Sequence, residues 1–227
     1  MVVKQILQAY RTYKVIGESE KEIRTMIEKA RSLFGASALA LLSQKEVSFD
    51  LYARDREIND LVVDIRKKIV EHLSVTACHN VGGELVFLKV INDIERVGDY
   101  SKNLLDLSKQ LSEPLPESDY LAKLAEMFPT VEGFFKKAER ALFDGVKEDA
   151  RAVIKGHLEI NQDCEGMVEA LLKNKEIPAP EAIALALTAR YFKRVSSHLK
   201  NVASTAVNPF PHIGYMHPEN PVVEEKD

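Results

Sequence analysis

Oxygen-bearing side chains recur every four residues in one stretch of the chain, at Glu95, Asp99 and Asn103. In a helix, side chains four residues apart share a face, with Cβ atoms about 5–6 Å apart. Two carboxylates at that spacing can share a hard cation, because such ions prefer oxygen ligands. Asp55 and Asn59 repeat the spacing upstream. An antiparallel partner helix carrying them would complete an oxygen-rich metal site.

The same spacing also fits the solvated face of an amphipathic helix, which is the commoner origin of acids four residues apart. Arg96 and Lys102 stand close enough in sequence to pair with these acids and neutralise them. Gly98 lies within the stretch, although Gly inside a helix costs about 1 kcal/mol relative to Ala. The close approach of a neighbouring helix at Gly98 would explain its presence.

These residues must be positioned by helices, because apolar residues recur at three- and four-residue steps in six segments. The segments are residues 18–44, 50–74, 84–111, 118–143, 147–173 and 181–206. Pro114 and Pro116 forbid helix continuation and separate the first three segments from the last three. We therefore predict an all-α fold of six helices, arranged as two tandem antiparallel three-helix bundles.

The two halves also resemble each other in sequence. Residues 57–59 and 159–161 both read Glu-Ile-Asn, and residues 95–103 align with 193–201 at Arg, Val, Lys and Asn. Matches in the same order within corresponding helices indicate a duplicated unit. We assign residues 1–113 to the first repeat and 114–206 to the second. The Pro-rich tail, residues 207–227, has too little periodicity to fold alone, and we expect it to be extended or disordered.

Composition excludes several classes of protein. The formal charge is −4, from 31 basic and 35 acidic residues, so the chain has no basic excess for nucleic-acid binding. Two cysteines are too few for a disulfide scaffold or a four-cysteine zinc site. The chain has no signal-peptide pattern and no run of 18 apolar residues. We expect a soluble, cytoplasmic protein that does not itself insert into a membrane.

A family resemblance rests on the third segment. Residues 91–103 read Ile-Asn-Asp-Ile-Glu-Arg-Val-Gly-Asp-Tyr-Ser-Lys-Asn. This resembles the signature of the PhoU family of phosphate-uptake regulators, an acidic residue followed by Leu-Glu-Arg-Ile-Gly-Asp, with Asn four residues later. Residues 55–59, Asp-Arg-Glu-Ile-Asn, are similar to the family's Asp-x-x-Val/Ile-Asn. Two tandem three-helix bundles are also the family's architecture, so the resemblance covers nearly the whole chain before the tail.

The resemblance implies a metal site, because Glu/Asp-x-x-x-Asp motifs in this family bind metal-ion clusters on the bundle surface. Glu95 and Asp99 would hold the ion, and Asp55, Asn59 and Asn103 would complete or orient the site. Iron, magnesium, manganese and zinc are the candidate ions. In the second repeat, Lys193 and Ser197 replace the two acids, and His157 stands where Asp55 stands. We therefore expect one metal site or none, with the packing kept in both halves.

The resemblance also implies a function. We expect a regulator of phosphate uptake and phosphate signalling that docks on a phosphate transporter or a sensor kinase and is not an enzyme. A homodimer is expected too, with residues 34–42, apolar nearly all round, as a candidate contact surface.

Two alternatives remain open at this point. One is a metal-independent helical scaffold or accessory domain of a transporter, in which Arg96 and Lys102 pair with the acids. The other is a metal-dependent hydrolase, for which the sequence shows neither a general base nor an enclosed pocket.

Overall fold

The computed structural model describes residues 2–75 and 81–215, with side chains described for 16–74 and 81–215. The described residues form six long helices and no strand, which confirms the all-α prediction. The elements are α1 (Val2–Ser43), α2 (Leu51–Val75), α3 (Val81–Gln110), α4 (Asp119–Asp144), α5 (Lys147–Lys173), α6 (Ala179–Ser204) and the short 3-10 helix η1 (Phe210–His212). No described helix combines the length and apolarity needed to cross a membrane.

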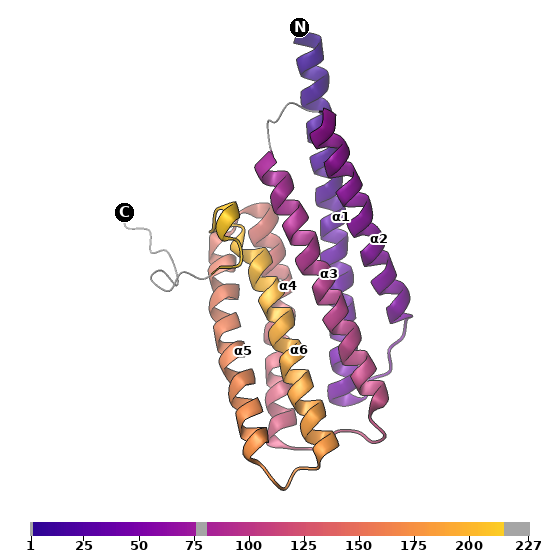
Figure 1. The fold of residues 1–227 in the computed structure, drawn as a ribbon, viewed down its shortest axis with the longest axis vertical. Helices are drawn as coiled ribbons and strands as arrows, with labels where there is room; N and C mark the ends of the chain where they lie inside the picture. Colours follow the sequence, from indigo (N-terminus) through magenta and orange to yellow (C-terminus); the bar gives the residue numbers. More distant parts are fainter. Residues whose placement is uncertain (1, 76–80, 216–227) are drawn as a thin grey trace, which may run out of the picture.

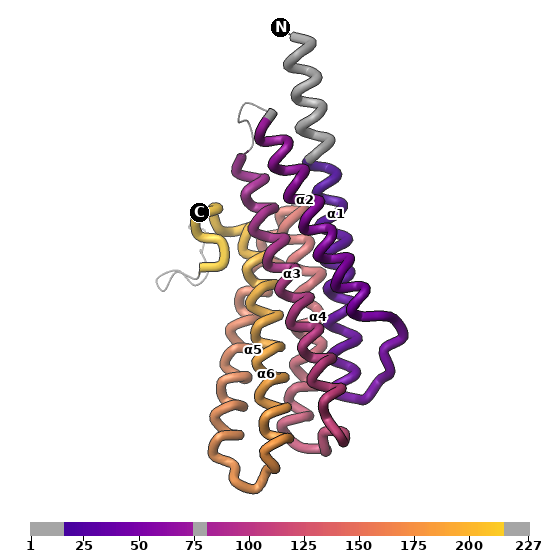
Figure 2. The backbone as a smooth tube through the Cα atoms, turned by 45° about the vertical axis from the view of Figure 1, so that its right-hand side comes forward, coloured from indigo at the N-terminus to yellow at the C-terminus, as the bar shows by residue number. Residues whose placement is uncertain are grey.

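The helices form two antiparallel three-helix bundles that lie side by side (Figure 1). Among the described residues, α2 packs only on α1 and α3 of its own bundle, and α5 packs only on α4 and α6. Helices α1 and α3 also contact the second bundle, through α4 and α6. The loop between α1 and α2 stands out at the outer edge of the first bundle (Figure 2).

One large hydrophobic core runs through both bundles, with Phe34 at the junction, and a small second cluster is formed by Leu41, Leu107 and Ala184. The centroid of its ring lies 5.8 Å from that of Phe128, 5.9 Å from Phe135 and 5.3 Å from Phe192. Four aromatic rings from α1, α4 and α6 therefore pack together where the bundles meet. Residues 34–42, which we considered as a dimer surface, are instead largely taken up by this internal contact. The homodimer stays a prediction, without that surface.

The helix boundaries differ from the predicted ones at two places. Helix α1 begins at Val2 rather than near residue 18, because residues 2–16 contain neither Gly nor Pro and nothing there stops a helix. Helix α3 begins at Val81 rather than at residue 84, so that it includes Gly82 and Gly83. Helix α4 has a local signal at each end: Ser118 Oγ accepts from the Leu121 amide and caps it, and Gly145 ends it in a left-handed conformation with φ 67°.

The tail folds back for its first nine residues, where we expected no regular structure. After α6 the chain turns through η1, and Ile213 is buried. Lys200 Nζ donates to the Gly214 carbonyl at 2.6 Å, and the Gly214 amide donates to Ser204 Oγ at 2.9 Å. These two bonds to α6 hold the turn in place, although its sequence has no hydrophobic periodicity. Residues 216–227 lie outside the described part.

Close packing between α4 and α5 makes Gly156 a test of the second bundle. A Cβ atom at Gly156 would lie 2.7 Å from Cζ of the buried Phe134. We expect Gly156→Ala to lower the free energy of unfolding by about 1 kcal/mol, since overpacking outweighs the gain in helix propensity. Urea denaturation measures the change.

Gly166→Ala, on the same helix, is the matched control, because a Cβ there has no neighbour within 4 Å. That variant should gain up to about 1 kcal/mol of stability. Equal effects of the two substitutions would contradict the packing of α5 on α4.

Candidate functional site

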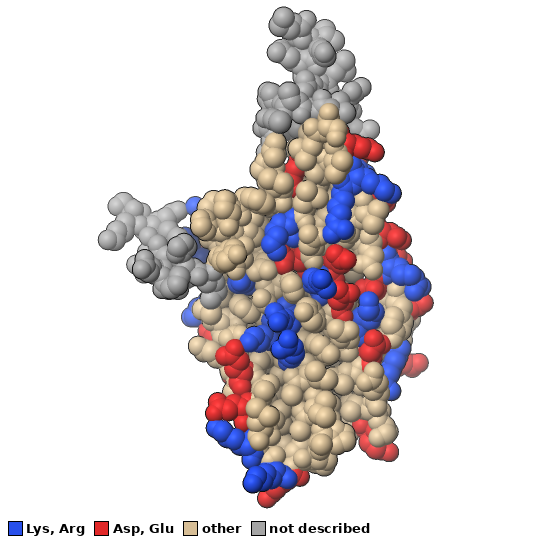
Figure 3. All heavy atoms as spheres, in the orientation of Figure 1, with Lys and Arg blue, Asp and Glu red and all other residues tan. Residues whose placement is uncertain are grey.

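The predicted site residues lie where α2 and α3 pack antiparallel, a region that we call the α2/α3 seam (residues 55–66 and 92–103). Lys102 Nζ donates to Asp55 Oδ2 at 2.9 Å, and Arg66 lies at the other end, 3.8 Å from Glu95 Oε2. These contacts fix the register of the two helices. Lys and Arg alternate with Asp and Glu over α2 and α3 in Figure 3.

Lys102 lies between two of the predicted metal ligands. Its Nζ is 2.9 Å from Asp55 Oδ2 and 3.5 Å from Asp99 Oδ1. Asp55 is buried, with 6% of its surface exposed. Burial alone would lower the pKa of Lys102, but the hydrogen bond and the charge of Asp55 outweigh it and hold that pKa above its ordinary value. The ammonium group therefore stays charged in the seam.

Gly98 makes room for this arrangement. A Cβ atom at Gly98 would lie 3.3 Å from Asp55 Oδ1 and 3.6 Å from Ile58 Cδ1. The sequence predicted close approach of a neighbouring helix at this glycine, and the structure shows two side chains of α2 in that position. Gly98 thus lets the Asp55 carboxylate rest against α3.

The structure brings only some of the five predicted ligands together. Asp55 and Asp99 share Lys102, whereas Glu95 lies opposite Arg66 instead. Asn59 and Asn103 are half-buried, and no hydrogen bond joins their amides to another residue of the described ranges.

The remaining acids of α2 do not extend the cluster. Asp60 and Asp64, a second pair of acids four residues apart on α2, are exposed. Within the described residues, no group of three His, Cys, Asp or Glu is arranged to hold a metal ion.

The donor set of the seam therefore does not fit a metal ion. Arg96 donates to Asp99 Oδ2 at 3.3 Å, so each of the three carboxylates already has a cationic side chain within 4 Å. A divalent ion would have to displace Lys102 from Asp55 or share the seam with it. Either costs electrostatic energy, since like charges at such distances repel.

The second repeat keeps the packing contact with different chemistry. His157 and Ser196, which correspond to Asp55 and Gly98, lie 2.9 Å apart at Nδ1 and Oγ. Lys193, which replaces Glu95, donates to Glu165 Oε1 at 2.7 Å. Burial lowers the pKa of His157 to about 4, and the charges of Lys200 and Lys193 act in the same direction. His157 is therefore neutral at pH 7.

Sequence reasoning missed a polar cluster between the bundles, centred on Asp93 of α3. The buried Asp93 carboxylate is bonded by His198 Nδ1 at 2.8 Å, Asn201 Nδ2 at 2.9 Å and Lys89 Nζ at 2.6 Å. Burial alone would raise the pKa of Asp93, but the hydrogen bonds from these three partners outweigh it and lower that pKa. One signal was available: Val90, three residues earlier, and Val97, four residues later, place Asp93 on the buried stripe.

The contacts around Asp93 show that α3 and α6 are related by an approximate two-fold axis. The repeat alignment makes Asp93 equivalent to Tyr191, and Tyr100 equivalent to His198. The Tyr100–Tyr191 contact, with centroids 6.1 Å apart, is therefore the counterpart of the bond between His198 and Asp93. Tyr100 also stacks on its own equivalent, His198, at 5.7 Å. The duplicated helices thus pack against each other through the same positions.

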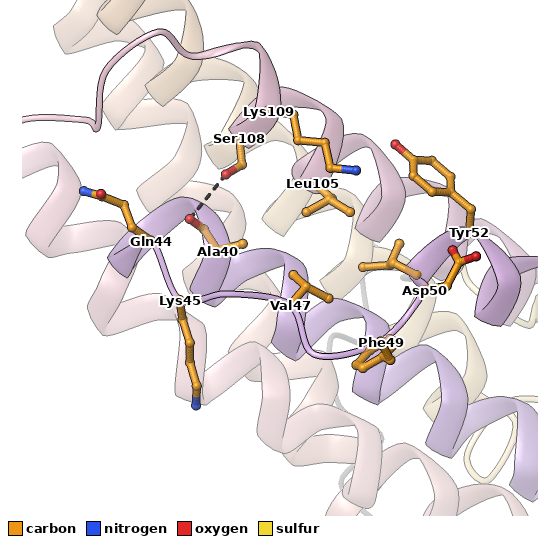
Figure 4. Close-up of a pocket in the computed structure, with 11 residues that line it drawn as sticks. Ala40, Gln44, Lys45, Val47, Phe49, Asp50, Tyr52, Leu105, Ser108 and Lys109 are labelled. Atoms are coloured by element: carbon orange, nitrogen blue, oxygen red, sulfur yellow. Dashed lines mark hydrogen bonds between the residues drawn. The ribbon is translucent and has the colours of Figure 1, made fainter.

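A separate hollow of about 420 Å³ lies between the α1–α2 loop and the end of α3. Its apolar lining residues are Ala40, Val47, Phe49, Leu51 and Leu105. Figure 4 shows Ser108 donating to the Ala40 carbonyl at one end of the hollow, at 3.3 Å.

Charged groups at the rim of this hollow are not balanced. Lys109 Nζ lies 4.8 Å from the Tyr52 ring centroid, and no carboxylate of the described chain pairs with it. Lys45 is a second lysine of the lining, and the carboxylate of the lining acid Asp50 also lies 3.9 Å from Arg56 Nη2. The rim therefore carries a net positive charge beside an apolar surface.

The fold and the seam together define a class of protein: a duplicated three-helix unit whose third helix carries Glu-Arg-x-Gly-Asp in one copy. The PhoU domain model matches residues 23–107 and again residues 124–206. The chain belongs to the PhoU domain family.

Named relatives agree with this assignment. A phosphate-specific transport system accessory protein PhoU homolog from Synechocystis is 23% identical over 224 residues, covering 88% of this chain and 92% of the relative. The phosphate transport system regulatory protein PhoU from Streptococcus pneumoniae superposes with a TM-score of 0.74 at 17% identity, covering 85% of this chain and 93% of that one. PhoU from Pseudomonas aeruginosa gives 0.67 at 14% identity, covering 88% and 96%.

The buried neutral His157 predicts a pH dependence of stability. The unfolded chain protonates this histidine near pH 6.5, whereas the folded chain does so only near pH 4. Neutral His157 therefore contributes to the free energy of unfolding above pH 6.5, and this contribution is lost as the pH falls from 6.5 towards 4. At pH 5 the loss from this group should be about 2 kcal/mol.

Urea denaturation at pH 7.5 and pH 5, on the wild type and on His157→Gln, measures this loss. The variant, which cannot take up the proton, should lose about 2 kcal/mol less than the wild type between the two pH values. Parallel losses in both proteins would show that His157 titrates normally in the folded state.

Proposed function

We propose that this chain is a cytoplasmic regulator of phosphate transport that acts by docking on a partner protein rather than by converting a substrate. The observation that carries this proposal is the family match in both repeats, residues 23–107 and 124–206. It is supported by the Synechocystis relative, whose name describes an accessory protein of phosphate-specific transport and which aligns over 88% of this chain.

The chemistry of the described side chains supports a role without catalysis. The three predicted ligand carboxylates of the α2/α3 seam, Asp55, Glu95 and Asp99, are each paired with a cationic side chain, which makes them poor candidates for a general base. Burial raises the pKa of the Cys164 thiol to about 12, so this cysteine stays protonated and is a poor nucleophile.

The hollow beside the α1–α2 loop is the contact that we assign to the partner, a phosphate transporter or a sensor kinase. An apolar side chain next to a carboxylate on the partner would fill the hollow and pair with Lys109. This complementarity follows from the lining of Val47, Phe49 and Leu105 and from the unpaired ammonium group at the rim.

The ion pairs in the seam favour the metal-independent form of this function. Asp55, Glu95 and Asp99 are all engaged by cationic side chains, so docking needs no metal bridge. The predicted metal site itself stays a prediction.

Deleting the gene in the source organism tests the regulatory role. We expect phosphate uptake to lose its dependence on external phosphate in the deletion strain and to regain it when the wild-type chain is supplied. Uptake that stays fully regulated without the chain would contradict the proposed function.

The docking site has its own prediction. Lys109→Glu should weaken binding to the purified transporter or kinase of the same organism by about tenfold, which corresponds to about 1.4 kcal/mol, because a rim attraction becomes a repulsion. Surface plasmon resonance measures the affinity. Lys175→Glu, at an exposed loop position remote in sequence from the hollow, is the control and should leave it unchanged. Equal affinities of both variants would place the contact elsewhere.

A further inference from the structure

We infer that the Lys102 ammonium group takes the place of a metal ion in the α2/α3 seam, so that this chain carries its own cation where the family resemblance implies a bound one. The inference concerns the stability and metal content of the chain, and it stands whether or not the chain regulates phosphate transport.

The position of the ammonium group is the first argument. Lys102 Nζ contacts one carboxylate from each helix, at 2.9 Å from Asp55 and 3.5 Å from Asp99. A cation held between carboxylates of two helices is the arrangement that the acid spacing predicted for a metal. The side chain reaches this point because Lys102 lies three residues after Asp99, on the same face of α3.

The burial of Asp55 is the second argument. With 6% of its surface exposed, this carboxylate would be strongly destabilising without a positive partner. Gly98 leaves the space that lets Asp55 lie against α3, since a Cβ there would be 3.3 Å from Asp55 Oδ1. Asp55, Gly98 and Lys102 therefore form one unit, in which the glycine admits the acid and the lysine neutralises it.

The charge balance of the predicted ligands is the third argument. The three carboxylates Asp55, Glu95 and Asp99 face three cationic side chains, and the contacts are those of Lys102, Arg66 and Arg96. These three carboxylates are therefore balanced before any ion is added, and a divalent ion among them would bring two uncompensated positive charges.

The second repeat provides independent support for a cation supplied by the chain itself. At the position of Glu95 it has Lys193, which is paired with Glu165 on α5 at 2.7 Å. At the position of Asp55 it has His157, whose pKa is lowered to about 4 by burial. Both copies thus join their second and third helices with protein side chains.

Replacing the lysine tests the inference by a gain of binding. Lys102→Met keeps much of the length of the side chain and removes its charge, which frees Asp55 and leaves Asp99 with Arg96 alone. We expect this variant to bind one Mn²⁺ per chain at least about tenfold more tightly than the wild type. Isothermal titration with Mn²⁺ measures binding, after EDTA treatment and dialysis of both proteins.

Two matched variants control for the charge and for the site. Lys102→Arg keeps a cation and should bind Mn²⁺ no better than the wild type. The double variant Lys102→Met with Asp99→Asn should lose the gain, which would locate the ion in the seam.

Thermal denaturation provides a second measurement. In EDTA, Lys102→Met should have a lower Tm than the wild type, because Asp55 loses its partner, and Mn²⁺ should restore most of the difference. Lys102→Gln serves as a second neutral variant if the methionine variant does not fold.

Three results would overturn the inference. The first is stoichiometric binding of Mn²⁺ by the wild type that Asp99→Asn abolishes. The second is a folded neutral variant that binds Mn²⁺ no better than the wild type. The third is failure of both neutral variants to fold even with Mn²⁺ present, which would show that a metal cannot replace the ammonium group.

Discussion

The antiparallel packing of α3 against α6 is the contact on which the rest of the molecule depends. It joins the third helices of the two repeats through equivalent positions, Tyr100 with Tyr191 and Asp93 with His198. On the far side of this contact Phe34 completes the shared core against Phe192. Each three-helix unit alone would expose this apolar surface. The shared core therefore forms only when the two repeats pack together. The outer helices α2 and α5 take no part in this contact, so their sequences can differ without disturbing it.

The two repeats differ in side-chain chemistry where α2 meets α3 and where α5 meets α6. In the first repeat a carboxylate enters beside Gly98 and is held by a lysine. In the second, a neutral histidine meets a serine at the same place. The contacts between the two third helices are thus symmetric in position, whereas the charges of the two repeats are not. A partner that recognises charge meets two different faces on one molecule, which favours a one-to-one complex with a fixed orientation.

The helices and the duplication were predictable from the sequence, because hydrophobic periodicity and Pro114 and Pro116 report local preferences. The meeting of α2 and α3 was predictable only in part: Asp55 and Asp99 do lie on facing surfaces, whereas Glu95 lies opposite Arg66 instead. The role of Lys102 was not settled, because spacing alone cannot tell whether a lysine points to solvent or between two acids. Asp93 was missed because its partners His198 and Asn201 are more than 100 residues away, and such distant contacts leave no local pattern. Residues 207–215 fold through bonds to α6 rather than through a period of their own.

The cation between Asp55 and Asp99 belongs to the polypeptide, and this has a consequence for physiology. An ion taken from the medium is present only when the cell can acquire it, and iron or manganese starvation would empty such a site. An amino group made at translation is present in every copy from the start. Helices α2 and α3 of the first repeat are therefore joined independently of nutrient supply, and a cell short of trace elements would keep this protein intact.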